Sequence, residues 1–201
     1  MGLKRHHRNI IDNKGMEGKH VCAFRDRTVL TEVAALIRLL SMRRRDREVT
    51  DPIRIREIIG QIKVCRLGLC DKNEAYIVPL NFGVEWKDET LRLYFHSSRH
   101  GRKIDLLKAS LWASFEMDGF HQLDPAPSGV SLCNYGYGYA CVMGRGNVRF
   151  MEGEEKAKGL ALLMLHQAGL DCSFSEKEAS AVEVFCLTAE TYSVKERVVN
   201  A

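Results

Sequence analysis

Short runs of apolar residues, several of them alternating with polar ones, follow one another through most of the chain after residue 60. Three runs are joined by the polar turns Asp71-Lys72-Asn73 and Lys87-Asp88, which is typical of an antiparallel meander. A segment with two prolines and two glycines, residues 120–136, predicts a loop. Six strands are predicted in all: 64–70, 75–86, 90–97, 112–119, 139–151 and 182–194.

Helical signals lie before, within and after this group of strands. Thr50 or Asp51 can cap a helix whose first residue is Pro52, and isoleucines form its apolar face. Residues 104–110 predict one or two helical turns, and 152–170 a longer helix with an acidic first turn. Six strands with a few helices favour a mainly β fold, a small closed or partly closed antiparallel barrel with peripheral helices packed outside.

The first part of the chain differs from the rest in composition and charge. Residues 1–50 hold 12 lysines and arginines against 6 acidic residues, whereas the remainder is nearly neutral. Met42 opens a charged run that resembles a chain start. We therefore expect residues 1–41 to be a poorly ordered or helical N-terminal extension and 42–201 to be one domain. A basic arm that contacts a polyanion is the alternative.

Several protein classes are disfavoured by composition. No stretch approaches the roughly 18 apolar residues of a membrane span, and no secretory signal is evident at the N-terminus. The seven cysteines include no C-x-x-C pair, so reduced thiols in a cytoplasmic protein are expected and no metal site is predicted. Because the body is nearly neutral and lacks interleaved basic and aromatic residues, no nucleic-acid partner is expected.

A cationic loop follows the strand 90–97. Backbone N–H groups of a tight, glycine-containing turn form an anion-binding concavity, and a helix N-terminus adds partial positive charge. Around Gly101, the loop adds the hydroxyl of Ser97 and the cations Arg99, Arg102 and Lys103. This pattern predicts a phosphate site, and the alternative is a solvated basic turn.

A second candidate is IVPLNFG, residues 77–83. Pro79 removes one ladder donor and so marks an edge or bulge, and Asn81 can point to the same face. An exposed backbone edge beside an amide suits a planar heterocycle with carbonyl and N–H edges. An ordinary edge strand explains the same residues.

VCRLGLC, AYIVPLNFG, YFHSSRHGRKIDLLK, FEMD and VMGRGNVRF, in this order, resemble the pyridoxamine-phosphate-oxidase-like flavin split barrels. The closest group includes the 5-nitroimidazole resistance proteins. The resemblance covers about residues 42–194. It implies a six-stranded antiparallel split β-barrel that forms a homodimer, with FMN at the subunit interface.

The resemblance also implies a role for individual residues. Arg102 and Lys103 would contact the FMN phosphate, with help from Ser97 and the Gly101 turn. The isoalloxazine edge and its surroundings would be lined by Arg66, Leu67, Val78, Pro79, Leu80, Asn81, Tyr139, Ala140, Cys141 and Val142. The family pattern has a serine at the position of Cys141, so the hydroxyl contact that the resemblance implies is in doubt in this chain.

His96 matches the histidine of the Y-F-H segment in the same group, close to the flavin and a substrate. It is either a catalytic proton donor or acceptor, or a structural partner of the loop. His166, on the apolar helix 152–170, is interpreted as a packing histidine with a satisfied ring.

The resulting hypothesis is an FMN-dependent oxidoreductase that passes electrons to a nitroaromatic (nitroimidazole-type) or another small planar acceptor. The alternative is a split barrel that binds flavin or haem without turnover, as a store or sensor. A haem-binding relative needs an axial ligand, for which His96 or a C-terminal histidine would be the candidate. Residues 171–201 contain no histidine, which counts against the C-terminal arrangement.

Overall fold

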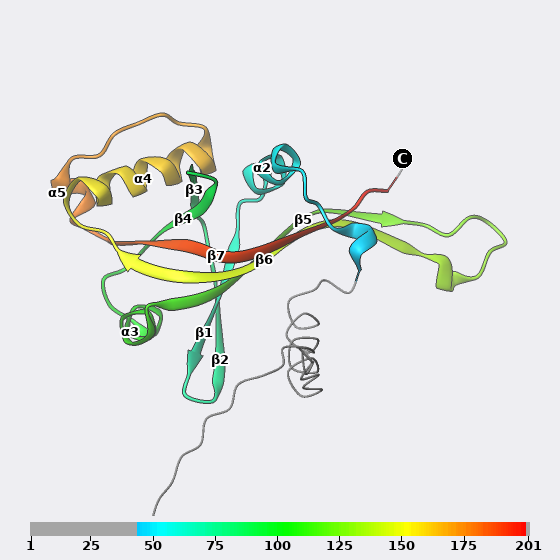
Figure 1. The fold of residues 1–201 in the computed structure, drawn as a ribbon, viewed down its shortest axis with the longest axis horizontal. Coiled ribbons are helices and arrows are strands. Elements are labelled where there is room, and N and C mark those ends of the chain that lie inside the picture. The colour runs from blue at the N-terminus through cyan, green and yellow to red at the C-terminus, as the bar shows by residue number, and fades with distance from the viewer. Residues whose placement is uncertain (1–43, 200–201) are drawn as a thin grey trace, which may run out of the picture. The chain divides into compact units, whose positions relative to one another are not determined.

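The computed structural model describes residues 44–199, and the predicted extension 1–41 lies outside them. A seven-stranded sheet dominates this part of the chain, with helices on its outside (Figure 1). The strands are β1 (Cys65–Asp71), β2 (Glu74–Leu80), β3 (Gly83–Lys87), β4 (Thr90–Ser97), β5 (Trp112–Asp124), β6 (Gly136–Phe150) and β7 (Glu183–Arg197). The helices are η1 (Arg45–Arg47), α2 (Pro52–Gln61), α3 (Arg102–Ser110), η2 (Leu132–Asn134), α4 (Gly153–Ala168) and α5 (Glu176–Ala179).

The sheet is antiparallel throughout and has the strand order β2-β1-β5-β6-β7-β4-β3. Its two edge strands, β2 and β3, are consecutive in the chain and are separated only by Asn81 and Phe82. Three Cα–Cα steps span at most about 11 Å, so the two edges must come close together. The sheet therefore curls into a barrel that stays split between β2 and β3.

This split corrects the strand count. The run 75–86 was predicted as one strand, but it divides at Asn81 and Phe82, which gives seven strands instead of six. The mainly β fold with peripheral helices is confirmed.

The predicted loop 120–136 is also shorter than expected. β5 continues to Asp124 and β6 begins at Gly136, so the two strands form a long projecting hairpin (Figure 1). The pairing register shifts between Gly119 and Gln122, and Phe120 takes a positive φ of 61°. This bulge lets the strand continue through the irregular region.

Local signals explain the predicted helices. The Asp51 carboxylate accepts a hydrogen bond from the Ile53 N–H at 3.0 Å, and Pro52 begins α2. Ile58 and Ile59 of this helix are completely buried in the barrel core. The short helix α5, which was not predicted, carries a capping box between Ser175 and Glu178.

Two apolar clusters stabilise the domain. The larger fills the barrel and contains Phe82, Phe95 and Phe185, all without exposed surface. The smaller lies under α4 and α5 and contains Tyr94 and Val184. These clusters fix the two faces of β4, and so decide where its side chains point.

Candidate functional site

The loop between β4 and α3 has the geometry of an anion site. Gly101 has a φ of 126°, a conformation that favours glycine, and a Cβ built there would contact nothing within 4 Å. No side chain caps α3. The backbone N–H groups of Arg102 and Lys103 have no acceptor within residues 44–199. Two free N–H donors at a helix N-terminus suit a phosphate.

Lys103 is half-buried beside these donors. Burial lowers the pKa of its ammonium group, and it makes no salt bridge with any residue that the structure describes. A partly desolvated cation without a counter-ion gains strongly from an incoming anion.

Arg102 points elsewhere. Its Nε donates to the Asp71 carboxylate at 3.0 Å, and its Nη2 donates to Glu74 at 3.2 Å. The guanidinium carbon lies 4.7 Å from the centre of the Tyr76 ring. The hydrogen bond with Asp71 is the main reason that the pKa of Arg102 is raised. Arg102 thus ties the start of α3 to the β1–β2 hairpin.

His96 and Ser97 lie on opposite faces of β4. Ser97 is buried on the core side, whereas His96 is exposed on the face that also carries Tyr94. His96 pairs in register with Val184 on β7. Its ring makes no hydrogen bond or ion pair with residues 44–199, so the two predicted contacts come from different sides of the strand.

The predicted flavin-edge segment alternates in the same way. Val78 and Leu80 are half-buried and pack against the barrel core, while Pro79 and Asn81 are exposed. Both protons of the Asn81 amide are used, because Nδ2 donates to the Lys63 carbonyl at 3.0 Å and to Gln167 Oε1 at 3.1 Å. The amide oxygen of Asn81 is the group left for a ligand.

Arg66 and Cys141 lie on one outer face of the sheet, joined through Glu116 on β5. Arg66 Nη1 donates to Glu116 Oε2 at 3.0 Å and also contacts Asp118, and Cys141 Sγ lies 3.8 Å from Glu116 Oε1. Burial, followed by the charge of Glu116, raises the pKa of the Cys141 thiol to about 11. The thiol is therefore protonated at neutral pH.

The pleat of strands β1 and β6 places the remaining predicted residues on opposite faces of the sheet. Leu67, Ala140 and Val142 have no exposed surface and belong to the barrel core, so only their backbone can contact a ligand. Tyr139 is half-buried, and its hydroxyl accepts a hydrogen bond from Arg47 at 3.2 Å. The structure thus brings Pro79, Arg66 and Cys141 to one face.

Sequence reasoning missed the acidic partners of these cations. Glu116 and Asp118 hold Arg66, while Asp71 and Glu74 hold Arg102. The period-two spacing of Glu116 and Asp118 in FEMD was a usable signal, because it puts both carboxylates on the exposed face of a strand.

The described residues also bear on two other classes of site. Between residues 44 and 199, no group of three or more His, Cys, Asp or Glu side chains could hold a metal ion. No helix in this range is long and apolar enough to cross a membrane.

A split antiparallel barrel with peripheral helices defines the class of this protein. The sequence profile of the pyridoxamine 5'-phosphate oxidase family matches residues 51–196, and the chain belongs to this family. Among curated proteins, no sequence matches the chain.

Solved structures with the same fold include a proposed 5-nitroimidazole antibiotic resistance protein from Bacteroides thetaiotaomicron. It is 30% identical, with a TM-score of 0.62, and the alignment covers 74% of this chain and 86% of that one. The flavocytochrome Anf3 from Azotobacter vinelandii is 20% identical, with a TM-score of 0.62 and coverage of 79% and 72%. An FAD- and haem-binding protein from Mycobacterium smegmatis is 16% identical, with a TM-score of 0.62 and coverage of 77% and 76%.

Proposed function

We propose that the chain is a cytoplasmic, FMN-binding oxidoreductase that reduces small planar acceptors, with nitroaromatics of the nitroimidazole type as the first candidates. The observation that carries the proposal is the uncapped N-terminus of α3, with its Gly101 turn and the unpaired, half-buried Lys103. Membership of the pyridoxamine 5'-phosphate oxidase family supports it. So does the 30% identity to the Bacteroides protein.

The described residues fit this cofactor. The two free N–H groups and Lys103 would hold a dianionic phosphate, and Ser97 would add a hydroxyl. The exposed edge at Pro79 and Asn81 offers backbone groups and an amide oxygen to a heterocycle, beside Arg66. The flavin, when bound, supplies the hydride and electron chemistry, and the protein binds and orients it.

His96 is proposed as the residue that exchanges a proton with the substrate. Its exposed ring has no partner within residues 44–199, so both nitrogens are available. His96→Gln should lower kcat and alter its pH profile while flavin affinity is retained. A structural role would instead weaken flavin binding, with little change in the pH profile.

We further propose that the protein is a homodimer with the cofactor at the subunit interface. Ile77 and Met143 point outward on the same face of the sheet and are 65% and 54% exposed, so they place large apolar side chains on this outer face. The ion-paired Arg66 lies between them. Sedimentation of the wild type and of Met143→Lys tests this: the substitution should shift a dimer toward monomer.

The visible absorption spectrum of the purified protein, repeated after FMN is added and the sample desalted, tests the cofactor. Retained flavin near one per subunit is the expected result. A colourless protein that fails to retain FMN would overturn the proposal, and a Soret band would favour the haem-binding alternative. Turnover is then tested by following oxidation of the reduced flavin by a nitroimidazole.

A further inference from the structure

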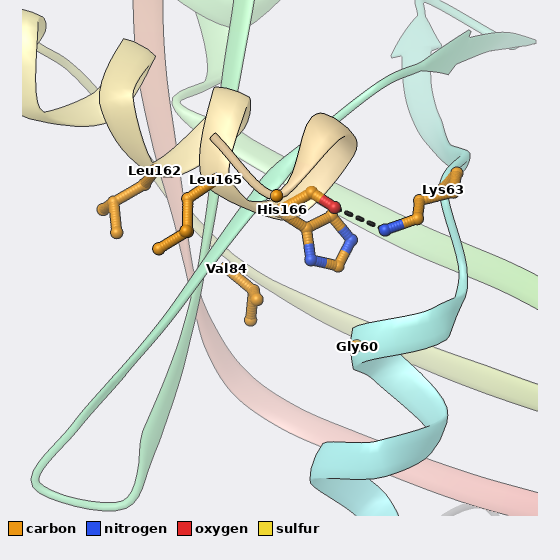
Figure 2. Close-up of a pocket in the computed structure, with 7 residues that line it drawn as sticks. Gly60, Lys63, Val84, Leu162, Leu165 and His166 are labelled. Atoms are coloured by element: carbon orange, nitrogen blue, oxygen red, sulfur yellow. Dashed lines mark hydrogen bonds between the residues drawn. The ribbon is translucent and has the colours of Figure 1, made fainter. Parts of the chain in front are cut away.

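A cavity of about 370 Å³ lies away from the loop at α3, between the end of α2, strand β3 and the last turns of α4 (Figure 2). It is within the size range of small-molecule sites in proteins. Its lining residues are Gly60, Lys63, Val84, Leu162, Leu165, His166 and Gly169.

Two glycines explain why the walls are close and the cavity is nevertheless open. At Gly83, a Cβ would lie 2.5 Å from the backbone nitrogen of Leu163, so α4 rests directly on the backbone of β3. At Gly60, a Cβ would meet nothing within 4 Å. Glycine is unfavourable within a helix, and here the missing side chain leaves the cavity unfilled.

His166 presents a lone pair in this cavity. The residue is only 9% exposed, and its Nε2 lies 2.8 Å from the carbonyl oxygen of Ile62. Because a carbonyl only accepts, Nε2 must carry the proton, and Nδ1 is then an acceptor. Nδ1 has no hydrogen-bond partner within residues 44–199. One ring nitrogen of this packing histidine is thus satisfied by the protein, and the other faces the cavity.

The ring is held firmly in this orientation. Its centre lies 4.5 Å from that of Phe82, at an interplanar angle of 37°. Burial lowers the pKa of His166, which keeps the ring neutral at neutral pH. The neighbouring Gln167 donates from Nε2 to the Phe82 carbonyl at 2.8 Å, so this last turn of α4 is fixed to the β2–β3 connection.

The charges around the cavity favour a neutral ligand. α2 ends at Gln61 and α4 at Ala168, so two helix C-termini bring partial negative charge to this region. The Lys63 ammonium donates to the His166 carbonyl and offsets that charge (Figure 2). An anion would face the helix ends, and a cation would face Lys63.

We propose that this cavity binds a compact, neutral, ring-containing molecule with one N–H or O–H donor. The donor bonds to Nδ1 of His166, and the apolar body contacts Val84, Leu162 and Leu165. Nδ1 faces the open cavity and has no partner among residues 44–199, so a ligand that donates a hydrogen bond to it is preferred to one of the same shape without the donor. The site does not depend on the proposed flavin site.

The test uses 4-methylphenol and its methyl ether, 4-methylanisole, which differ in the hydrogen-bond donor. Each is titrated into the full chain with ¹⁵N-labelled histidine, and His166→Gln identifies the His166 signals. The phenol should bind at millimolar concentration or below and shift the Nδ1 resonance to lower frequency. The ether should bind at least about tenfold more weakly. No Nδ1 shift, or equal affinity for both compounds, overturns the proposal.

A pair of α2 variants tests the location. Gly60→Leu should fill the cavity and abolish phenol binding, because the new side chain projects into open space. Gln61→Leu introduces the same side chain at the adjacent exposed position, which does not line this cavity, and should leave binding unchanged. Retained binding in folded Gly60→Leu would contradict the assignment, and the comparison of the two compounds on the wild type remains decisive if that variant does not fold.

Discussion

Arg102 and Asp71 are joined by two contacts, from Nε at 3.0 Å and from Nη2 at 2.9 Å to the same carboxylate oxygen. The guanidinium that the sequence assigned to a cofactor phosphate therefore has a counter-ion already, at the tip of the β1–β2 hairpin. Lys103, its neighbour, has none within residues 44–199. Arg102 and Lys103 are therefore not equivalent.

We predict that Lys103→Ala weakens FMN binding more than Arg102→Ala does. Lys103 has no counter-ion to give up, so the loss of its charge-assisted contact with the phosphate should cost about 1.5–3 kcal/mol. Arg102 must leave the Asp71 carboxylate before it can contact the phosphate, so its removal should cost less. Fluorescence titration with FMN measures both. Riboflavin, which lacks the phosphate, is the control ligand, and its affinity should change little in Lys103→Ala. A larger loss in Arg102→Ala would show that Arg102 leaves Asp71 to bind the phosphate.

The helices and most strands of this domain could be predicted because their signals are local. The cap at Asp51, Pro52 at the first position of α2, and the alternation in 90–97 all act within a few residues. The break at Asn81 and Phe82 could not be predicted, because it arises from the curling of the sheet. Pro79 marks an edge or bulge within the run 75–86, but no local signal places a strand break at Asn81 and Phe82.

The residue types of the candidate site were predictable, but their partners were not. Asn81 bonds to Lys63 and Gln167, which are 18 and 86 residues away in the chain. Arg102 meets Asp71 across 31 residues. Such contacts depend on tertiary packing, and they decide which polar groups remain free for a ligand.

His166 should make the stability of the domain depend on pH. Its pKa in the folded protein is lowered by burial, whereas in the unfolded chain it returns to about 6.5. The unfolded state therefore binds the proton first as pH falls, and the free energy of unfolding decreases by at most about 1.4 kcal/mol per pH unit from this group.

Urea unfolding at pH 7.5, 6 and 5 measures this effect against His166→Gln. The stability difference between wild type and variant should shrink as pH falls, since the variant has no ring to protonate. His100→Gln, which removes an exposed histidine, is the control. A constant difference would mean that folding does not change the pKa of His166, and a difference that grows toward low pH would mean that the folded state binds the proton more tightly.

Gly83→Ala should destabilise the domain. Its Cβ would lie 2.5 Å from the Leu163 nitrogen and 2.6 Å from the Leu162 carbonyl carbon, both backbone atoms that move only with α4. We expect a loss of about 1–3 kcal/mol in the free energy of unfolding. Gly60→Ala is the matched control, since its Cβ meets open space and the helix should gain up to about 1 kcal/mol. Equal effects at the two positions would show that α4 does not rest on Gly83.

Cys141 should be unreactive at neutral pH although it is only half-buried. With a pKa raised to about 11, its thiolate fraction at pH 8 is about 100-fold below that of a thiol with the ordinary value of 9.0. Alkylation by iodoacetamide, followed by mass spectrometry of each cysteine peptide, compares it with the exposed Cys133. Cys133 should be modified first, and the rate at Cys141 should rise about tenfold per pH unit between pH 8 and 10. Rapid modification of Cys141 at pH 7 would show that the charge of Lys195 outweighs burial and Glu116 at this thiol, and that the thiol is available for redox chemistry at this face of the sheet.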